Sequence, residues 1–234
     1  MKEEIVSTGY PANQVAVIPN GCDLDLFEDS QAARHLRQQY EWLADRSLLV
    51  FSGTFGLVNG VDYLVRLAAV IARIDSEVRI VAVGTGREFE RTRQLAVEMG
   101  VLNENLFLLG RLPKHEAAAW TLAADMTIAL FTGPEIVWRD AVQNKFFDSL
   151  AAGKPVVNNF PGWQSKLAAE AGAGLILSAT DMDSAAHDIV NALRDPRWME
   201  QAGLAARKLA EGRFNRDNLA VELLGVLKEA YEQR

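Results

Sequence analysis

The chain has 234 residues, of which 49% are hydrophobic and 24% are charged, so it is long and apolar enough for a globular fold with a sizeable core. Lys and Arg number 24 against 31 Asp and Glu, which gives a net charge of −7. This acidic balance, without any basic run, excludes a protein that wraps nucleic acid, whereas an anionic ligand could still bind at one local site.

Short apolar segments alternate with amphipathic stretches along most of the chain. The predicted strands are Val15–Ile18, Leu48–Ser52, Val78–Val83, Leu106–Leu109, Met126–Leu130, Pro155–Val157 and Leu175–Leu177. The predicted helices are 59–74, 87–99, 114–124, 142–152 and 182–194, followed by forty helical residues with breaks at Asp195-Pro196 and Gly212. The pattern predicts an α/β fold in which one doubly wound, parallel, Rossmann-like sheet forms a single domain over residues 1–234.

Glycines follow four of the predicted strands, at Gly53, Gly84, Gly110 and Gly133. In a doubly wound sheet, ligands bind beyond the carboxyl ends of the strands, and glycine lets the backbone pass close to a phosphate. Gly53 and Gly56 follow the predicted strand Leu48–Ser52, and Gly84 and Gly86 follow the predicted strand Val78–Val83. A third glycine is absent because Phe89 occupies its position, which argues against a nicotinamide-dinucleotide fingerprint.

A helix start is predicted after the strand at 126–130. Asp140 as N-cap and Gln143 three residues later would form a capping box. The backbone amides of Val142 to Asn144 would then point out of the helix start, where unpaired donors and the helix dipole attract phosphate. Lys145 would add a positive charge there.

The same helix carries a second carboxylate. Asp148 lies four positions after Asn144 and shares its helix face. Gly153 suits the end of the helix, and Pro155 prevents its continuation. The alternative interpretation is that Asp140 only caps the helix and that Asp148 is only solvated.

Four segments in chain order, 17–27, 83–88, 109–113 and 140–155, resemble motifs of one enzyme family. They resemble the C-terminal, donor-binding half of retaining glycosyltransferases with the GT-B fold, in family four, also called group one. The pair Asn144-Lys145 is similar to a bacterial subgroup that transfers acetamido sugars in surface polysaccharide synthesis.

The resemblance implies roles for individual residues. Asp140 would contact the donor sugar and Lys145 would supply charge, and these two are the candidate catalytic residues. Asp148 would bind the ribose, and Leu112 would meet the nucleobase through its backbone. The implied donor-binding residues are Gly53, Thr54, Gly56, Asn59, Gly84, Gly86, Arg111, Leu112, Val142, Gln143, Asn144 and Asp148.

The chain departs from the family pattern at several positions. Both acids are Asp where the family usually has Glu, and Thr54 and Asn59 occupy the positions of two usual basic residues. Trp138 and Trp163 are expected in loops beside the site, as candidate sugar contacts. We expect neither a metal nor a cofactor, with a uridine diphosphate (UDP) sugar as the substrate.

The resemblance implies transfer of a hexose or acetamido sugar to a glycan or lipid-linked acceptor, in bacterial surface polysaccharide or lipopolysaccharide synthesis. The N-terminal acceptor domain of such enzymes is not in this sequence, so we expect the chain alone to be inactive. Two alternatives remain open: a domain of a sugar-nucleotide epimerase with the GT-B fold, and a non-catalytic module that binds a nucleotide or a partner.

Cysteine usage and hydropathy bear on the location. The single cysteine, Cys22, excludes an internal disulfide and a cysteine-rich metal site, and it indicates a reducing compartment. No run of about eighteen apolar residues is present. We expect a cytoplasmic protein, with peripheral association at the inner face of the membrane as an alternative for the full protein.

Overall fold

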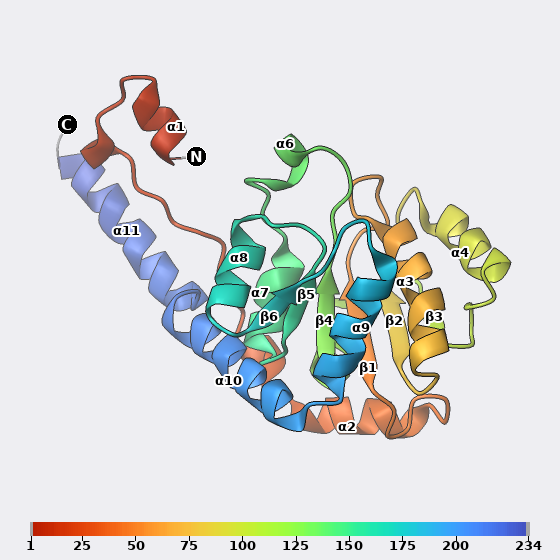
Figure 1. Cartoon of the computed structure of the whole chain (residues 1–234). Helices are drawn as coiled ribbons and strands as arrows, with labels where there is room; N and C mark the ends of the chain where they lie inside the picture. The colour runs from red at the N-terminus through yellow and green to blue at the C-terminus, as the bar shows by residue number, and fades with distance from the viewer. Residues whose placement is uncertain (1, 233–234) are drawn as a thin grey trace.

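Six parallel strands form one sheet in the order β3-β2-β1-β4-β5-β6 (Figure 1). The computed structural model describes residues 2–232. The strands are β1 (Leu48–Ser52), β2 (Arg79–Val83), β3 (Leu106–Leu109), β4 (Met126–Ala129), β5 (Val156–Asn158) and β6 (Gly174–Ile176). This order reverses direction between β1 and β4, as in a doubly wound fold, and confirms the predicted fold class.

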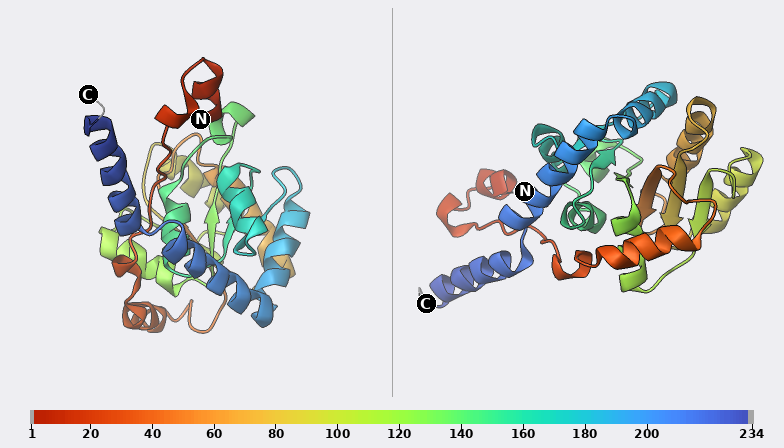
Figure 2. Two further views of the ribbon diagram at one scale, coloured as in Figure 1. Left: turned by 90° about the vertical axis from the view of Figure 1, so that its left-hand side faces the viewer. Right: turned by 90° about the horizontal axis from the view of Figure 1, so that it is seen from below.

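Helices cover both faces of this sheet (Figures 1 and 2). They are α1 (Lys2–Ser7), α2 (Ser30–Gln39), α3 (Val61–Ile74), α4 (Phe89–Glu98), α5 (Lys114–Ala123), α6 (Glu135–Trp138), α7 (Asn144–Ala151), α8 (Trp163–Glu170), α9 (Met182–Leu193), α10 (Pro196–Gly212) and α11 (Arg216–Glu232). On one face α3, α4 and α9 share a core with the strands, and on the other face α2, α5, α7 and α10 do so.

Alternation along β1 explains how one strand serves two cores. Leu49 and Phe51 belong to the core under α3 and α9, whereas Leu48 and Val50 belong to the core under α2 and α5. All four side chains are at most 1% exposed. A strand buried on both faces is apolar at successive positions, and this pattern made β1 predictable to the residue.

One predicted strand is wrong, and the predicted helices do not include α1, α2, α6 and α8. Val15–Ile18 is not a strand: Val15 donates its backbone N–H to Ala12 in a turn, and Val17 is 56% exposed. An apolar run forms a strand only beside a strand with free hydrogen-bonding groups, and this segment has none next to it. Helix α2 was not predicted, because only Ala33 and Leu36 of its ten residues are buried and the apolar repeat is therefore weak.

The last helix leads away from the sheet (Figures 1 and 2). In α11 only Leu219 is buried. Val221, Leu224, Leu227 and Tyr231 are all more than half exposed and recur at intervals of three and four residues. These side chains form one apolar stripe on the helix.

Candidate functional site

Two glycine-containing loops meet at the carboxyl ends of β1 and β2. The loop after β1 donates hydrogen bonds from Gly53 to Val83 and from Phe55 to Thr85. A Cβ atom on Gly84 would overlap the carbonyl oxygen of Gly53, and one on Gly86 would overlap that of Phe55. Gly84 and Gly86 therefore have a structural reason to be glycine, which is the close contact between the two loops.

A hollow of 390 Å³ lies beside these loops. It is lined by Ser52, Gly53, Thr54, Val83, Gly84, Thr85, Arg111, Leu112 and Ala117. The structure thus brings together five residues that were predicted to bind the donor: Gly53, Thr54, Gly84, Arg111 and Leu112. The volume lies within the range of pockets for small ligands.

Lys145 is buried at the end of β1. Its Nζ atom has no hydrogen-bond partner among the described residues and lies 3.8 Å from the centroid of the Phe51 ring. A Cβ atom on Gly53 would lie only 2.9 Å from Nζ, so the amine touches the glycine loop. Burial lowers the pKa of Lys145 to about 7. The interaction with the Phe51 ring offsets part of the free-energy cost of removing the ammonium from water, and no other described group offsets the remainder.

Asp148 is the second titratable group without a partner. Burial raises the pKa of its carboxyl to about 6, against a smaller opposing effect of Lys114. No side-chain hydrogen bond of Asp148 exists among the described residues, because both nearby cations are engaged by Asp23, Lys114 at 3.0 Å and Arg216 at 2.9 Å. A desolvated carboxylate that lacks donors is suited to a ligand that brings its own hydroxyl groups.

Lys145 and Asp148 lie three positions apart on α7 and line one enclosed cavity of 10 Å³ together with Thr127 and Ser149. They form no ion pair within the described residues. The cavity itself is too small to hold a nucleotide, so a ligand would reach either group from outside it. A ligand would therefore meet Lys145 from the side of Gly53, after a change in the lysine side chain.

The predicted capping box is wrong. Helix α7 begins at Asn144, with Gln143 at the N-cap position and no side-chain cap. Asp140 lies further upstream, where its carboxylate accepts a hydrogen bond from Arg139 at 3.0 Å. The amide of Gln143, one of three amides predicted to face phosphate, instead donates to Gln164 of α8 at 3.0 Å.

The helix start still offers free donors. The backbone amides of Asn144 and Lys145 donate no hydrogen bond within residues 2–232. The Asn144 side chain is engaged, because its Oδ1 atom accepts from Asn20 at 2.9 Å. Val142 is 42% exposed. Two backbone amides at the start of this eight-residue helix are therefore available to an anion.

Other predicted residues have local roles. The side chain of Asn59 donates to the carbonyl of Thr54 and closes the loop after β1. Trp163 does not lie in a loop, because it is the first residue of α8, and its indole N–H donates to Ala141 at 3.0 Å. Sequence reasoning missed Gln164, because no local pattern indicates its contact with Gln143.

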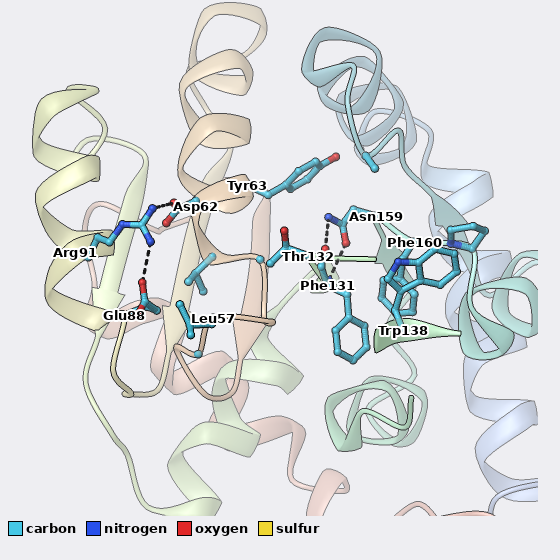
Figure 3. A pocket seen from close by; sticks show the side chains of 16 residues that line it. Leu57, Asp62, Tyr63, Glu88, Arg91, Phe131, Thr132, Trp138, Asn159 and Phe160 are labelled. Atoms are coloured by element: carbon cyan, nitrogen blue, oxygen red, sulfur yellow. Dashed lines mark hydrogen bonds and ion pairs between the residues drawn. The ribbon is translucent and has the colours of Figure 1, made fainter. Parts of the chain in front are cut away.

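A separate hollow of 480 Å³ is shown in Figure 3. Arg91 binds Asp62 and Glu88 on one side of it. Trp138 and Phe160 lie on the other side (Figure 3). Of the residues predicted to bind the donor, Gly56 lines this hollow, and so does Trp138, a candidate sugar contact.

Residues 2–232 contain neither an evident metal site nor a membrane-spanning helix. No group of three or more His, Cys, Asp or Glu side chains in this part of the chain is placed to hold a metal ion. No helix in the same residues combines the length and the hydropathy that crossing a membrane requires.

Several known proteins are similar to this chain in sequence, and several solved structures are similar to it in fold. A mannosyltransferase of Mycobacterium tuberculosis, named GDP-mannose-dependent alpha-(1-6)-phosphatidylinositol monomannoside mannosyltransferase, is 28% identical over 232 residues, which cover 97% of this chain and 59% of that protein. A D-inositol 3-phosphate glycosyltransferase of Xylanimonas cellulosilytica is 26% identical over 235 residues, covering 97% and 54%. The chain thus spans less than two thirds of the length of either relative.

Solved structures agree with this likeness. The Anabaena protein HepE, in complex with UDP-glucose, matches with a TM-score of 0.80 at 20% identity, over 97% of this chain and 61% of that one. Sucrose-phosphate synthase of Thermosynechococcus elongatus matches with a TM-score of 0.80 at 20% identity, over 100% and 57%. The sequence profile of the family described as glycosyl transferases group 1 matches residues 33–209. The chain therefore belongs to the group 1 glycosyltransferases.

Proposed function

We propose that this chain binds a nucleoside-diphosphate sugar and acts as the donor-binding domain of a retaining glycosyltransferase. One observation carries the proposal. The amine of Lys145 is buried without a partner against Gly53, at the point where the order of the sheet reverses. A buried ammonium requires an anion, and a diphosphate beside Gly53 supplies one.

The neighbouring groups fit the other parts of such a ligand. The 390 Å³ hollow, with the backbone of Arg111 and Leu112, takes the nucleobase. The unpartnered carboxylate of Asp148 accepts hydrogen bonds from the ribose hydroxyl groups. The free amides at the start of α7 join Lys145 on the diphosphate, and the sugar extends toward Asp140.

In this arrangement the protein favours departure of the diphosphate. Negative charge grows on the leaving oxygen as the bond to the sugar breaks, and preorganised donors stabilise that charge. Lys145 gains its proton most readily when the anion is present, because the anion raises a pKa that burial alone lowers to about 7. Asp140 orients the sugar through its hydroxyl groups, and no step requires a metal ion.

We infer a uridine nucleotide. The lining of the 390 Å³ hollow contains no carboxylate, which is the side chain best suited to the paired donors on the edge of guanine. The complex of HepE with UDP-glucose supports this choice, whereas the mannosyltransferase named above carries GDP-mannose in its name. The acetamido sugar rests only on the likeness of Asn144-Lys145 to one bacterial subgroup.

The acceptor side of the reaction is a further proposal. The acceptor would be a glycan or lipid-linked sugar of a bacterial surface polysaccharide or lipopolysaccharide, bound by a second domain. The exposed apolar stripe of α11 supports a second domain, because large apolar side chains on one helix face usually pack against protein.

Isothermal titration of the chain with uridine, guanosine and adenosine diphosphates tests the proposal. We expect UDP to bind in the micromolar to millimolar range, roughly −8 to −4 kcal/mol, and to bind more tightly than the purine nucleotides. Tighter binding of guanosine diphosphate would overturn the uridine assignment. The absence of heat with all three at millimolar concentration would overturn the donor site.

A further inference from the structure

Three consecutive residues, Gly162 to Gln164 at the start of α8, lie against the segment 138–143 that leads into α7. A Cβ atom on Gly162 would lie 2.9 Å from the carbonyl oxygen of Trp138, so only glycine fits there. The Trp163 indole N–H donates to the carbonyl of Ala141 at 3.0 Å. Gln164 contacts the backbone of Gln143, two residues after Ala141. The segment is therefore held by hydrogen bonds at Ala141 and Gln143, and it packs closely on Gly162 at Trp138.

The contact of Gln164 is the most specific of the three. Its Oε1 atom accepts from the amide of Gln143 at 3.0 Å, and its Nε2 atom donates to the carbonyl of the same residue at 3.3 Å. One side-chain amide thus satisfies both backbone groups of Gln143, as a neighbouring strand would. Gln164 is 1% exposed, so water does not compete for these bonds.

Gln143 passes this restraint on to the sheet. Its own Nε2 atom donates to the carbonyl of Leu130, directly after β4, at 2.8 Å. The residue before the first turn of α7 is therefore tied to α8 on one side and to the end of β4 on the other. Because α7 has no side-chain cap, these tertiary bonds take over what a cap would do at its start.

We propose that Gln164, supported by Trp163, is a positioning residue that fixes the start of α7 for the diphosphate. Neither residue contacts the ligand. Without the Gln164 amide, the backbone N–H of Gln143 would lose its partner and its carbonyl would keep only the bond from the Phe146 amide, so the free amides of Asn144 and Lys145 would be held less firmly in one direction. This inference rests on the proposed function for its ligand, although the restraint itself does not depend on a ligand.

The test compares three variants of the full chain. Gln164→Met keeps the length of the side chain and removes both hydrogen bonds, and Trp163→Phe removes only the indole N–H. Lys166→Met is the matched control, because Lys166 lies on the same helix but is exposed to solvent. Thermal melting first shows that each variant is folded. Trp163→Phe, as the milder change, keeps the test valid if Gln164→Met fails to fold.

Hydrogen exchange gives the first measurement. In Gln164→Met we expect the hydrogen-bonded amides of this segment, those of Gln143 and Ala141, to exchange about tenfold faster, with smaller changes elsewhere. Trp163→Phe should act in the same segment but less strongly, and Lys166→Met should leave it unchanged. Unchanged hydrogen exchange of this segment in both Gln164→Met and Trp163→Phe would overturn the inference.

The second measurement is the affinity of each variant for UDP and for uridine, determined from the chemical-shift changes of the protein during titration. We expect Gln164→Met to weaken UDP about tenfold and to leave uridine within about twofold, since only the diphosphate meets the helix start. A purely structural role would weaken both ligands equally, and that result would overturn the positioning role. If the unmodified chain binds no UDP, the proposed function fails, while hydrogen exchange still decides whether Gln164 holds the segment.

Discussion

The substitution Asp148→Asn should stabilise the fold while it weakens nucleotide binding. The carboxyl of Asp148 has a pKa of about 6 in the folded chain, raised by burial from its ordinary value of 3.8. The folded state therefore holds the proton more tightly than the unfolded state does. As the pH rises from 3.8 through 6, the unfolded chain loses this proton first, and the folded chain loses stability relative to it.

The size of this effect follows from the shift. About two pKa units correspond to about 3 kcal/mol of destabilisation at pH 7, where the buried carboxylate is charged in the folded chain. Asparagine has nearly the same shape but no charge. We expect Asp148→Asn to raise the free energy of unfolding at pH 7 by up to about 3 kcal/mol, with a much smaller gain at pH 4.

Binding should change in the opposite direction. Hydrogen bonds from ribose hydroxyl groups to a carboxylate are charge-assisted, and the loss of the charge costs roughly 1.5–3 kcal/mol. The assays are urea unfolding at pH 4 and pH 7 and calorimetric titration with UDP. A loss of stability at pH 7 would refute the unpartnered, desolvated state of this carboxylate. Unchanged UDP affinity in a stabilised variant would refute its role at the ribose.

Three further predictions concern the same site. Lys145→Met should stabilise the fold most at and below pH 7 in urea unfolding, because the unfolded chain keeps the lysine proton between pH 7 and 10.5 while the folded chain does not. The same variant should lose more affinity for UDP than for uridine, and an equal loss for both ligands would show that the lysine acts through packing. Gly53→Ala should weaken UDP in calorimetry, since a backbone φ of +153° strains a residue with a Cβ and this Cβ, 2.9 Å from Nζ, would displace the lysine amine; unchanged affinity would place the diphosphate elsewhere. The chain alone should transfer no sugar from labelled UDP-sugars to glycan or lipid acceptors, because joint orientation of donor and acceptor can supply about 7–11 kcal/mol; saturable transfer by these residues would contradict the need for a second domain.

The parts of the fold that the sequence predicted well are those with strong local signals. β1 and β3 have their predicted bounds, because each is a short apolar run between turn residues. Asp195 caps α10 by accepting hydrogen bonds from the amides of Arg197 and Trp198, as the break at Asp195-Pro196 indicated. Such signals arise within a few residues of the chain, so no tertiary information is required to read them.

The errors occur where distant residues decide the structure. The pair Asp140 and Gln143 has the spacing of a capping box, yet Gln164, twenty-one residues later, binds the amide of Gln143. Lys145 was expected to add a positive charge at the helix start, and the structure places its amine in a buried position against Phe51 and Gly53, which the sequence did not indicate. Helix spacing predicts which face a residue shares and cannot show what packs on that face.

The prediction for Gly84 and Gly86 illustrates a further difference. Glycines after a strand suggested contacts to phosphate, whereas the structure uses both for close approach of the two loops. The role of Gly53 is different, because a Cβ atom on this residue would point at the Lys145 amine. Sequence alone cannot separate a glycine that faces backbone from one that faces a ligand site.

The central claim is that a diphosphate binds beside Gly53 and takes Lys145 as its counter-ion. Its most direct test is a pH titration of the Lys145 side chain by nuclear magnetic resonance, without UDP and at saturating UDP, with Lys145→Met used to assign the signal. We predict a signal that titrates near pH 7 in the free chain and at a clearly higher pH in the complex, because the anion stabilises the ammonium. Saturable UDP binding that leaves the Lys145 titration unchanged would contradict the account.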